Sequence, residues 1–349
     1  MNQATFNFAP RGKRADLAAA RNGAKAPVRG PVAANDADPG DALGFDYARF
    51  GMVPPAPCLW PGHPIREGWE RGRRLMTRRT RPATLAVTRW LALRLAAWQR
   101  GEGFDDHQIT PQVLRSLEAA THCPITGRAL GNDAVVVPVD VQRGWAAGNL
   151  MLVSPAIAER WAAIDYAVAK DALARAEAEP DEVVDGLALR HWRRVVALKS
   201  LATPLPHAEA AGIPLLVLPP NRLRLVNPIQ ELQAVLTLQL SVPGWGQRAR
   251  TVADSLPETL RTEFNLFFNS LLAQSLRQGA GGDKPQMRDA LAAAWGNEVV
   301  MRRWLRFTAL VDADLAATLV DRLTHDPMPG LVVVRHGNAA AAVQEPVAV

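Results

Sequence analysis

Cysteine and lysine are scarce in this sequence. The two cysteines, Cys58 and Cys123, lie far apart, so at most one disulfide could form, and no CxxC pair is present to hold a structural zinc ion. This usage fits a reducing cytoplasm. Of the 40 basic residues, 35 are arginine and 5 are lysine. An arginine excess can reflect selection for binding, but it also follows from a GC-rich coding sequence.

Long apolar segments and common catalytic signatures are missing as well. The longest apolar run of interest, Ile213–Leu218, is far shorter than the roughly 20 residues that a membrane span needs, and the first residues lack the apolar region of a secretory signal. We therefore expect a cytoplasmic protein with no membrane partner. The G-x-S-x-G, Walker A, H-E-x-x-H and dinucleotide-binding glycine patterns do not occur.

What the sequence does contain is enough apolar material for a core, together with excess positive charge. It has 349 residues, of which 48% are hydrophobic, so the whole chain cannot be disordered. Its formal net charge is +6. This charge favours an anionic partner, with nucleic acid as the first candidate.

The pattern of helices, prolines and glycines predicts a mainly helical fold with one small β-hairpin and a helical C-terminal domain. We expect residues 45–62 to form an ordered loop, a single helix to run from Pro155 to about Glu179, and another helix to span 182–203, with His191 as an interface or core residue. The predicted organisation is a disordered basic arm (1–44), arginine-rich helices with the hairpin (45–203), a proline-rich connector (204–228), a helical domain (229–334) and a frayed tail (335–349).

One segment carries a specific pattern of turn, strand, loop, strand and helix. CPITG (Cys123–Gly127) forms a tight turn, and two short β-branched or apolar runs follow at Ala134–Val139 and Leu150–Val153. Between these runs, GWAAGN places glycines where a loop needs positive φ. Pro155 then begins a helix.

On these motifs, residues 122–165 resemble the ββα core of HNH endonucleases. Members of that family use a His or Asp at the end of the first strand as general base, beside one divalent metal ion. The resemblance covers only this segment of the chain. The residues that match the family's turn and hairpin loop, and that we expect to shape the hairpin, are Cys123, Gly127, Asp140, Gly144, Gly148 and Asn149.

The positions that carry the family's chemistry are replaced. The general-base position falls on Val137, the helix asparagine on Ala158 and the helix lysine on Trp161. The resemblance therefore implies the fold and argues against the activity, and we expect no metal or other cofactor. Mg²⁺ or Mn²⁺ would be needed only if other residues, such as His122 and Asp140, restored a metal site.

A basic patch precedes this segment. Residues 61–100 contain ten arginines and two glutamates, with tryptophans interleaved. Arginine suits phosphate contacts and tryptophan can stack on bases, although a solvated face with i,i+4 ion pairs would give the same pattern. The predicted nucleic-acid contacts are Arg71, Arg73, Arg74, Arg78, Arg79 and Arg81.

Three functions are consistent with these observations. The leading hypothesis is a catalytically inactive, HNH-derived protein that binds nucleic acid, DNA rather than RNA, or acts as an accessory to such binding. The second is an active metal-dependent endonuclease with non-standard ligands. The third is a structural or interaction protein with no nucleic-acid role, and residues 229–334 could mediate self-association or contact with another protein under any of the three.

Overall fold

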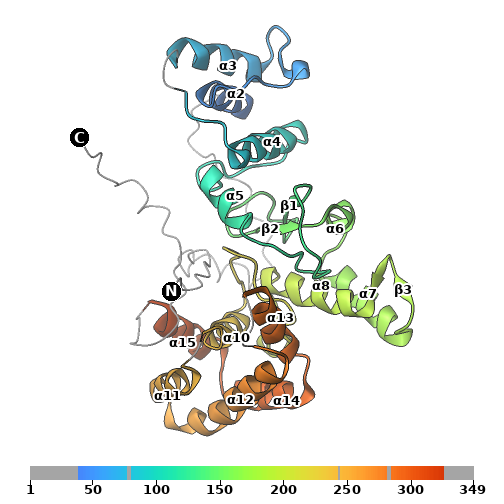
Figure 1. The fold of residues 1–349 in the computed structure, drawn as a ribbon, viewed down its shortest axis with the longest axis vertical. Helices are drawn as coiled ribbons and strands as arrows, with labels where there is room; N and C mark the ends of the chain where they lie inside the picture. The colour runs from blue at the N-terminus through green and yellow to red at the C-terminus, as the bar shows by residue number, and fades with distance from the viewer. Residues whose placement is uncertain (1–37, 77–79, 243, 281–283, 326–349) are drawn as a thin grey trace, which may run out of the picture. The chain divides into compact units, whose positions relative to one another are not determined.

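The computed structural model describes residues 38–76, 80–242, 244–280 and 284–325. Within these ranges the chain is mainly helical, with 14 α-helices and two small antiparallel strand pairs (Figure 1). The prediction of a mainly helical fold with a small β-hairpin is confirmed at this level. Most of the predicted arm, the predicted tail, Arg78 and Arg79 lie outside the described residues.

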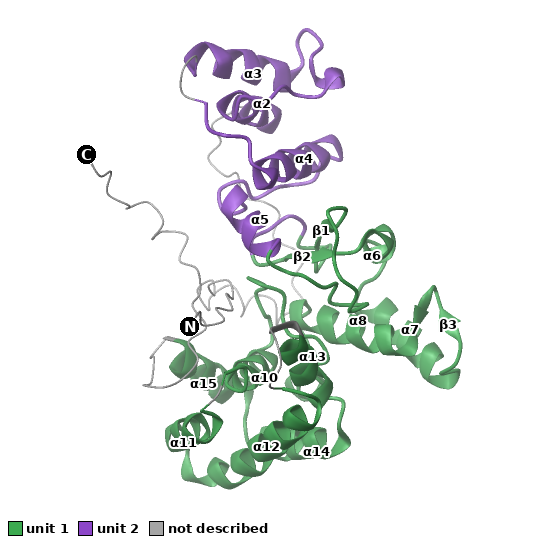
Figure 2. Ribbon diagram, in the orientation of Figure 1, with its two compact units in different colours: residues 1–10, 119–143, 148–349 green, residues 11–118, 144–147 purple. Residues whose placement is uncertain are grey.

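The described chain divides into two compact units (Figure 2). Unit 2 comprises the described residues up to Glu118 together with the loop Gly144–Ala147, and unit 1 comprises 119–143 and the described residues from Gly148 onward. The predicted connector 204–228 therefore does not separate two domains. It lies inside unit 1, and its apolar residues Leu215 and Leu223 are buried in the core of that unit.

Unit 2 begins with a helix that the sequence did not indicate. Helix α2 starts where the Asp38 carboxylate accepts a hydrogen bond from the Gly40 N–H at 2.7 Å and Pro39 occupies the first turn. The expected arm up to residue 44 and the expected loop from residue 45 are therefore wrong over 39–49. The helices of unit 2 are α2 (Pro39–Arg49), the short 3-10 helix η1 (Ala56–Cys58), α3 (Pro64–Leu75), α4 (Leu85–Gln99) and α5 (Pro111–Leu117).

Glycines explain how α2 packs against α3. A Cβ at Gly44 would lie 1.9 Å from the Ile65 carbonyl oxygen, and a Cβ at Gly68 would lie 1.9 Å from the Asp41 carbonyl oxygen. Only glycine permits this backbone approach. Because the buried face of α3 consists of Ile65, Gly68 and Gly72, its charged residues are left on the other faces.

Unit 1 contains the predicted hairpin and a helix that follows it. Strand β1 (Val135–Pro138) pairs antiparallel with β2 (Leu150–Val153), with Val137 opposite Met151. The expected single helix over 155–179 is wrong, because the structure divides it into α6 (Pro155–Trp161) and α7 (Tyr166–Ala178). Asp165 begins the second helix by accepting a hydrogen bond from the Val168 N–H at 2.8 Å.

A second strand pair replaces the start of another expected helix. Strands β3 (Val183–Val184) and β4 (Leu187–Ala188) are joined by Asp185 and Gly186, whose φ angles are 48° and 77°. Positive φ at both central residues of a two-residue loop is typical of a tight hairpin. The expected helix over 182–203 therefore begins only at residue 189, as α8 (Leu189–Ala202).

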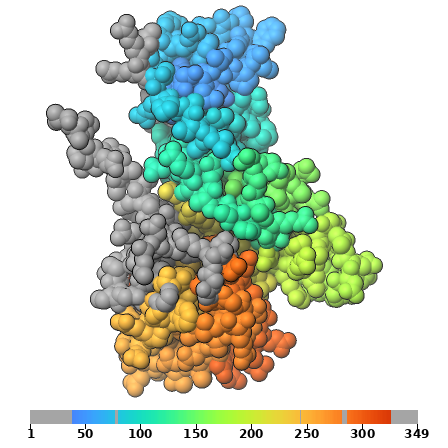
Figure 3. Space-filling model, in the orientation of Figure 1, coloured from blue at the N-terminus to red at the C-terminus, as the bar shows by residue number. Residues whose placement is uncertain are grey.

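The remaining helices complete one continuous core with the hairpin. Buried residues from Cys123 to Leu323 form a single hydrophobic cluster, and every residue of α10 from Ile229 to Leu238 is buried. Side chains close the gaps between these helices (Figure 3). No helix within the described ranges combines the length and the apolar character that crossing a membrane requires. The helices concerned are α9 (His207–Gly212), α10 (Pro228–Leu238), α11 (Trp245–Ser255), α12 (Glu258–Arg277), α13 (Lys284–Ala294), α14 (Glu298–Thr308) and α15 (Ala313–His325).

Candidate nucleic-acid interface

The loop of the hairpin is held by one buried asparagine. Asn149 is fully buried. Its Oδ1 accepts the Asp140 N–H at 2.9 Å, and its Nδ2 donates to the Asp140 carbonyl oxygen at 2.7 Å. Gly144 and Gly148 have φ angles of 59° and 77°, which other residues rarely adopt. The loop shape therefore depends on residue types that the sequence places at these positions.

The CPITG turn packs beneath the hairpin. The Gly127 N–H donates to the Cys123 carbonyl oxygen at 2.9 Å, and the φ angle of Gly127 is 68°. Burial acts to raise the pKa of the Cys123 thiol, but backbone N–H groups, chiefly those of Thr126 and Ser154, outweigh it and lower the pKa. Cys123 is 1% exposed, so its side chain serves the core.

The three residues that the resemblance aligns with catalytic positions lie in apolar surroundings. Val137 and Trp161 are buried, and Ala158 packs against the same core. The indole Nε1 of Trp161 donates to the Pro138 carbonyl oxygen at 2.8 Å, so the tryptophan ties α6 to the end of β1. None of these three side chains offers an oxygen or a basic nitrogen to a metal ion.

A lysine from another helix lies against this cluster, which the sequence analysis did not predict. The Lys199 ammonium is 3.9 Å from the centre of the Trp161 ring and donates to the Val139 carbonyl oxygen at 3.0 Å. Lys199 is 3% exposed, and burial lowers its pKa to about 8, against opposing effects of Asp140 and Asp165. A cationic group therefore occupies the apolar side of the hairpin.

The two residues named as possible replacement ligands have other hydrogen-bond partners. His122 is exposed, and its Nδ1 lies 2.9 Å from the Thr121 hydroxyl. Asp140 accepts a hydrogen bond from the Gln142 N–H at 2.9 Å. Among the residues that the structure describes, no group of three or more His, Cys, Asp or Glu side chains is placed to share a metal ion.

Helix α3 carries three of the four described arginines that were predicted to contact nucleic acid. The side chains of Arg71 and Arg74 are 53% and 78% exposed, and Arg73 is also exposed. The Arg73 guanidinium lies 4.9 Å from the centre of the Trp69 ring. We call Arg71, Arg73 and Arg74 the α3 arginine surface. Arg81 is exposed too, and its backbone N–H donates to the Arg49 carbonyl oxygen at 2.9 Å.

Acidic partners, most of them from outside the patch, reduce its charge. Arg71 pairs with Asp41, and Arg94 is buried between Asp46 and Asp106 at 2.5 and 2.9 Å. Further ion pairs join Arg66 to Glu70, Arg89 to Glu118 and Arg100 to Glu102. Across the described ranges, Arg73 forms no ion pair with a carboxylate.

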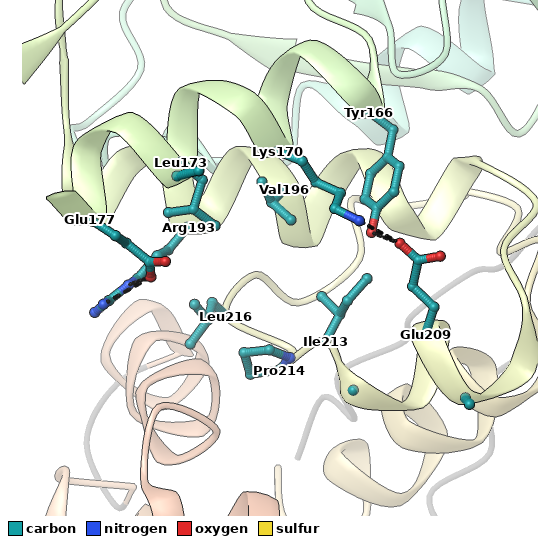
Figure 4. A pocket seen from close by; sticks show the side chains of 13 residues that line it. Tyr166, Lys170, Leu173, Glu177, Arg193, Val196, Glu209, Ile213, Pro214 and Leu216 are labelled. Atoms are coloured by element: carbon teal, nitrogen blue, oxygen red, sulfur yellow. Dashed lines mark hydrogen bonds and ion pairs between the residues drawn. The ribbon is translucent and has the colours of Figure 1, made fainter.

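A groove of about 520 Å³ lies between α7, α8 and α9 of unit 1 (Figure 4). Its floor is apolar, and an ion-paired group lies at each end. At one end Glu209 accepts from Tyr166 at 3.0 Å and from Lys170 at 2.8 Å, and at the other Arg193 pairs with Glu177 at 3.2 Å. Because its charged groups satisfy one another, the groove presents little to an ionic ligand.

A second group of arginines, which the sequence analysis did not predict, gathers at the CPITG turn. Arg190 and Arg194 lie one turn apart on α8, and Arg128 follows the turn directly. A Cβ at Gly127 would lie 3.1 Å from a terminal nitrogen of Arg194. The i,i+4 spacing was visible in the sequence, but the approach of α8 to the turn was not.

Comparisons of the chain with protein-family models, with curated proteins and with solved structures found no match. Its function therefore has to be inferred from the chemistry and geometry of its own residues. Two features bear on that inference: a hairpin unit in which Val137, Ala158 and Trp161 lie in apolar surroundings, and two groups of arginines, of which all but Arg194 are exposed.

Proposed function

We propose that this protein binds DNA by contacting backbone phosphates, without cutting it. The observation that carries the proposal is the division of α3 into two faces. One face, formed by Ile65, Gly68 and Gly72, is buried against α2, while the α3 arginine surface faces solvent. Guanidinium groups on a fixed helix can donate paired hydrogen bonds to phosphate oxygens.

The hairpin unit supports a nuclease ancestry for this function. A degenerate HNH-like core is our interpretation of β1, β2 and α6, because the order of elements and the asparagine-held loop follow the pattern on which the resemblance rests. On this interpretation the positions of the general base, the helix asparagine and the helix lysine hold Val137, Ala158 and Trp161. The buried charge of Lys199 beside Trp161 would further oppose a divalent cation.

Salt-dependent DNA binding tests the proposal. Fluorescence anisotropy of a labelled DNA duplex would be measured in EDTA over a KCl series, where the slope of log K against log salt reports phosphate contacts. We expect measurable binding that weakens as KCl rises. Arg73→Glu/Arg74→Glu should reduce affinity on the order of tenfold or more and lower the slope by about two.

The control is an equal change of charge on another exposed helix. Arg302→Glu/Arg306→Glu on α14 removes two exposed arginines in the same way, and its slope should match the wild type. A duplex RNA of the same sequence should bind more weakly than the DNA. Equal loss in both double variants would indicate a response to net charge alone, and absence of DNA binding at low salt would overturn the proposal.

Catalysis is tested separately. Supercoiled plasmid incubated with the purified protein and Mg²⁺ or Mn²⁺ should remain intact. Nicking that disappears in Asp140→Ala would show a working metal site and would contradict the part of the proposal that denies cleavage.

A further inference from the structure

The arginines at the CPITG turn differ from those of α3 in their surroundings. Within the ranges that the structure describes, Arg128, Arg190 and Arg194 form no ion pair with a carboxylate. Their neighbour Arg193 on the same helix does, with Glu177 at 3.2 Å. Among the described residues, these three arginines therefore have no compensating acid.

The start of α8 adds to this positive field. The first turn contains Arg190 and His191 and no acidic residue, and the N-cap residue Ala188 makes no side-chain capping bond. Cations at a helix N-terminus are unfavourable, because the helix dipole places partial positive charge there. A bound anion would relieve this local repulsion.

The pKa of His191 is affected by the same positive charges. Its Nε2 lies 3.4 Å from the Arg190 Nε. Burial lowers its pKa, and the charges of Arg190, Arg194 and Arg128 lower it further. The three arginines thus all act on one half-buried imidazole.

We propose that Arg128, Arg190 and Arg194 form a second phosphate-binding site for the DNA backbone, in unit 1. This inference rests on the proposed function, because it names another contact for the same ligand. A terminal nitrogen of Arg194 lies beside the glycine of the turn, and the other two arginines are exposed. Planar guanidinium donors suit the oxygens of a phosphate better than they suit a neutral ligand.

Single substitutions on α8 provide a matched test. Arg190→Gln and Arg194→Gln each remove one unpaired charge, whereas Arg193→Gln removes an ion-paired one from the same helix. In the KCl series, each of the first two should lower the salt slope by about 0.9 and weaken DNA binding several-fold at low salt, while Arg193→Gln leaves the slope unchanged. Arg194→Lys keeps the charge and should keep the salt slope. If the Arg194 guanidinium were only structural, Arg194→Lys would lose DNA affinity as Arg194→Gln does.

The outcomes separate the two proposals. If Arg190→Gln, Arg194→Gln and Arg193→Gln all bind as the wild type does, while Arg73→Glu/Arg74→Glu binds weakly, the second site is wrong and the proposed function stands. If the wild type binds no DNA, the proposed function fails, and calorimetry with inorganic phosphate tests the second site independently. Heat of phosphate binding that is present in the wild type and lost in Arg194→Gln would support a site for free phosphate. The absence of any heat of binding in the wild type would overturn the second site.

Discussion

The Asn149 side chain bonds both backbone groups of Asp140, at 2.9 and 2.7 Å, from a fully buried position. Asn149→Ala would leave the part-buried N–H and carbonyl oxygen of Asp140 without these partners. We expect the free energy of unfolding to fall by about 2–3 kcal/mol, since two polar groups that are shielded from water each lose a partner. Urea unfolding followed by circular dichroism measures this loss.

Asp140→Ala is the matched control, because the bonds to Asn149 use the backbone of residue 140. The side chain of Asp140 accepts one hydrogen bond from the Gln142 N–H at an exposed turn. Its removal should cost less than about 1 kcal/mol. A loss as large as that of Asn149→Ala would mean that the carboxylate, rather than the backbone bonds, holds the loop.

The buried Lys199 predicts an unusual dependence of stability on pH. Burial lowers its pKa from 10.5 to about 8 in the folded protein. Between these values the unfolded chain binds more protons than the folded one, so the free energy of unfolding should rise with pH, by about 3 kcal/mol over the whole interval. Below pH 8 both states are protonated, and the full penalty of burying the charge is present.

Lys199→Met isolates this effect. The variant loses the bond to the Val139 carbonyl oxygen at every pH, so the informative quantity is the change of stability with pH rather than its value at one pH. We expect the rise above pH 8 to be absent from the variant when both proteins are unfolded with urea across the alkaline range. Parallel profiles would show that the Lys199 pKa is not lowered.

The sequence predicts best the features that depend on neighbouring residues. The helical class and the hairpin over Ala134–Val139 and Leu150–Val153 follow from local patterns of apolar residues, glycines and prolines. The effective charge of the arginine patch cannot be predicted from these local patterns. Asp46 and Glu118, which lie outside the patch, pair with Arg94 and Arg89 only in the folded unit. Tertiary packing likewise decides where the Lys199 ammonium lies.

The helix α2 was missed for a related reason, and its packing makes a prediction of its own. Glycine at position 44 weakens a helix in isolation, yet here a Cβ would meet the Ile65 carbonyl oxygen at 1.9 Å. Gly44→Ala should therefore lower the unfolding temperature of unit 2 despite the better helix propensity of alanine.

At Gly246 in α11 no atom lies within 4 Å of an added Cβ, so Gly246→Ala should leave stability unchanged or raise it by up to about 1 kcal/mol. Differential scanning calorimetry compares the two, and similar shifts would contradict the close approach of α2 and α3.

The loop residue Trp145 is a structural part of unit 2. Its Nε1 donates to the Glu102 carboxylate at 2.7 Å, and its ring stacks on Phe104 with centroids 6.2 Å apart. Trp145 is 8% exposed, whereas Trp60 is 71% exposed. Trp145→Ala should lower the free energy of unfolding by about 3–5 kcal/mol, and Trp60→Ala should change it by less than about 0.5 kcal/mol.

Trp145→Phe divides that loss into two parts. Phenylalanine keeps an aromatic ring to stack on Phe104 but cannot donate to Glu102, so its cost should be about 1 kcal/mol plus a smaller packing loss. Far-UV circular dichroism during urea unfolding measures the loss, because its signal reports the helices and does not depend on the tryptophan that each variant removes. If Trp145→Ala and Trp60→Ala lower the free energy of unfolding equally little, the packing of Trp145 does not stabilise unit 2. The loop Gly144–Ala147 would then lie near unit 2 without contributing to its stability.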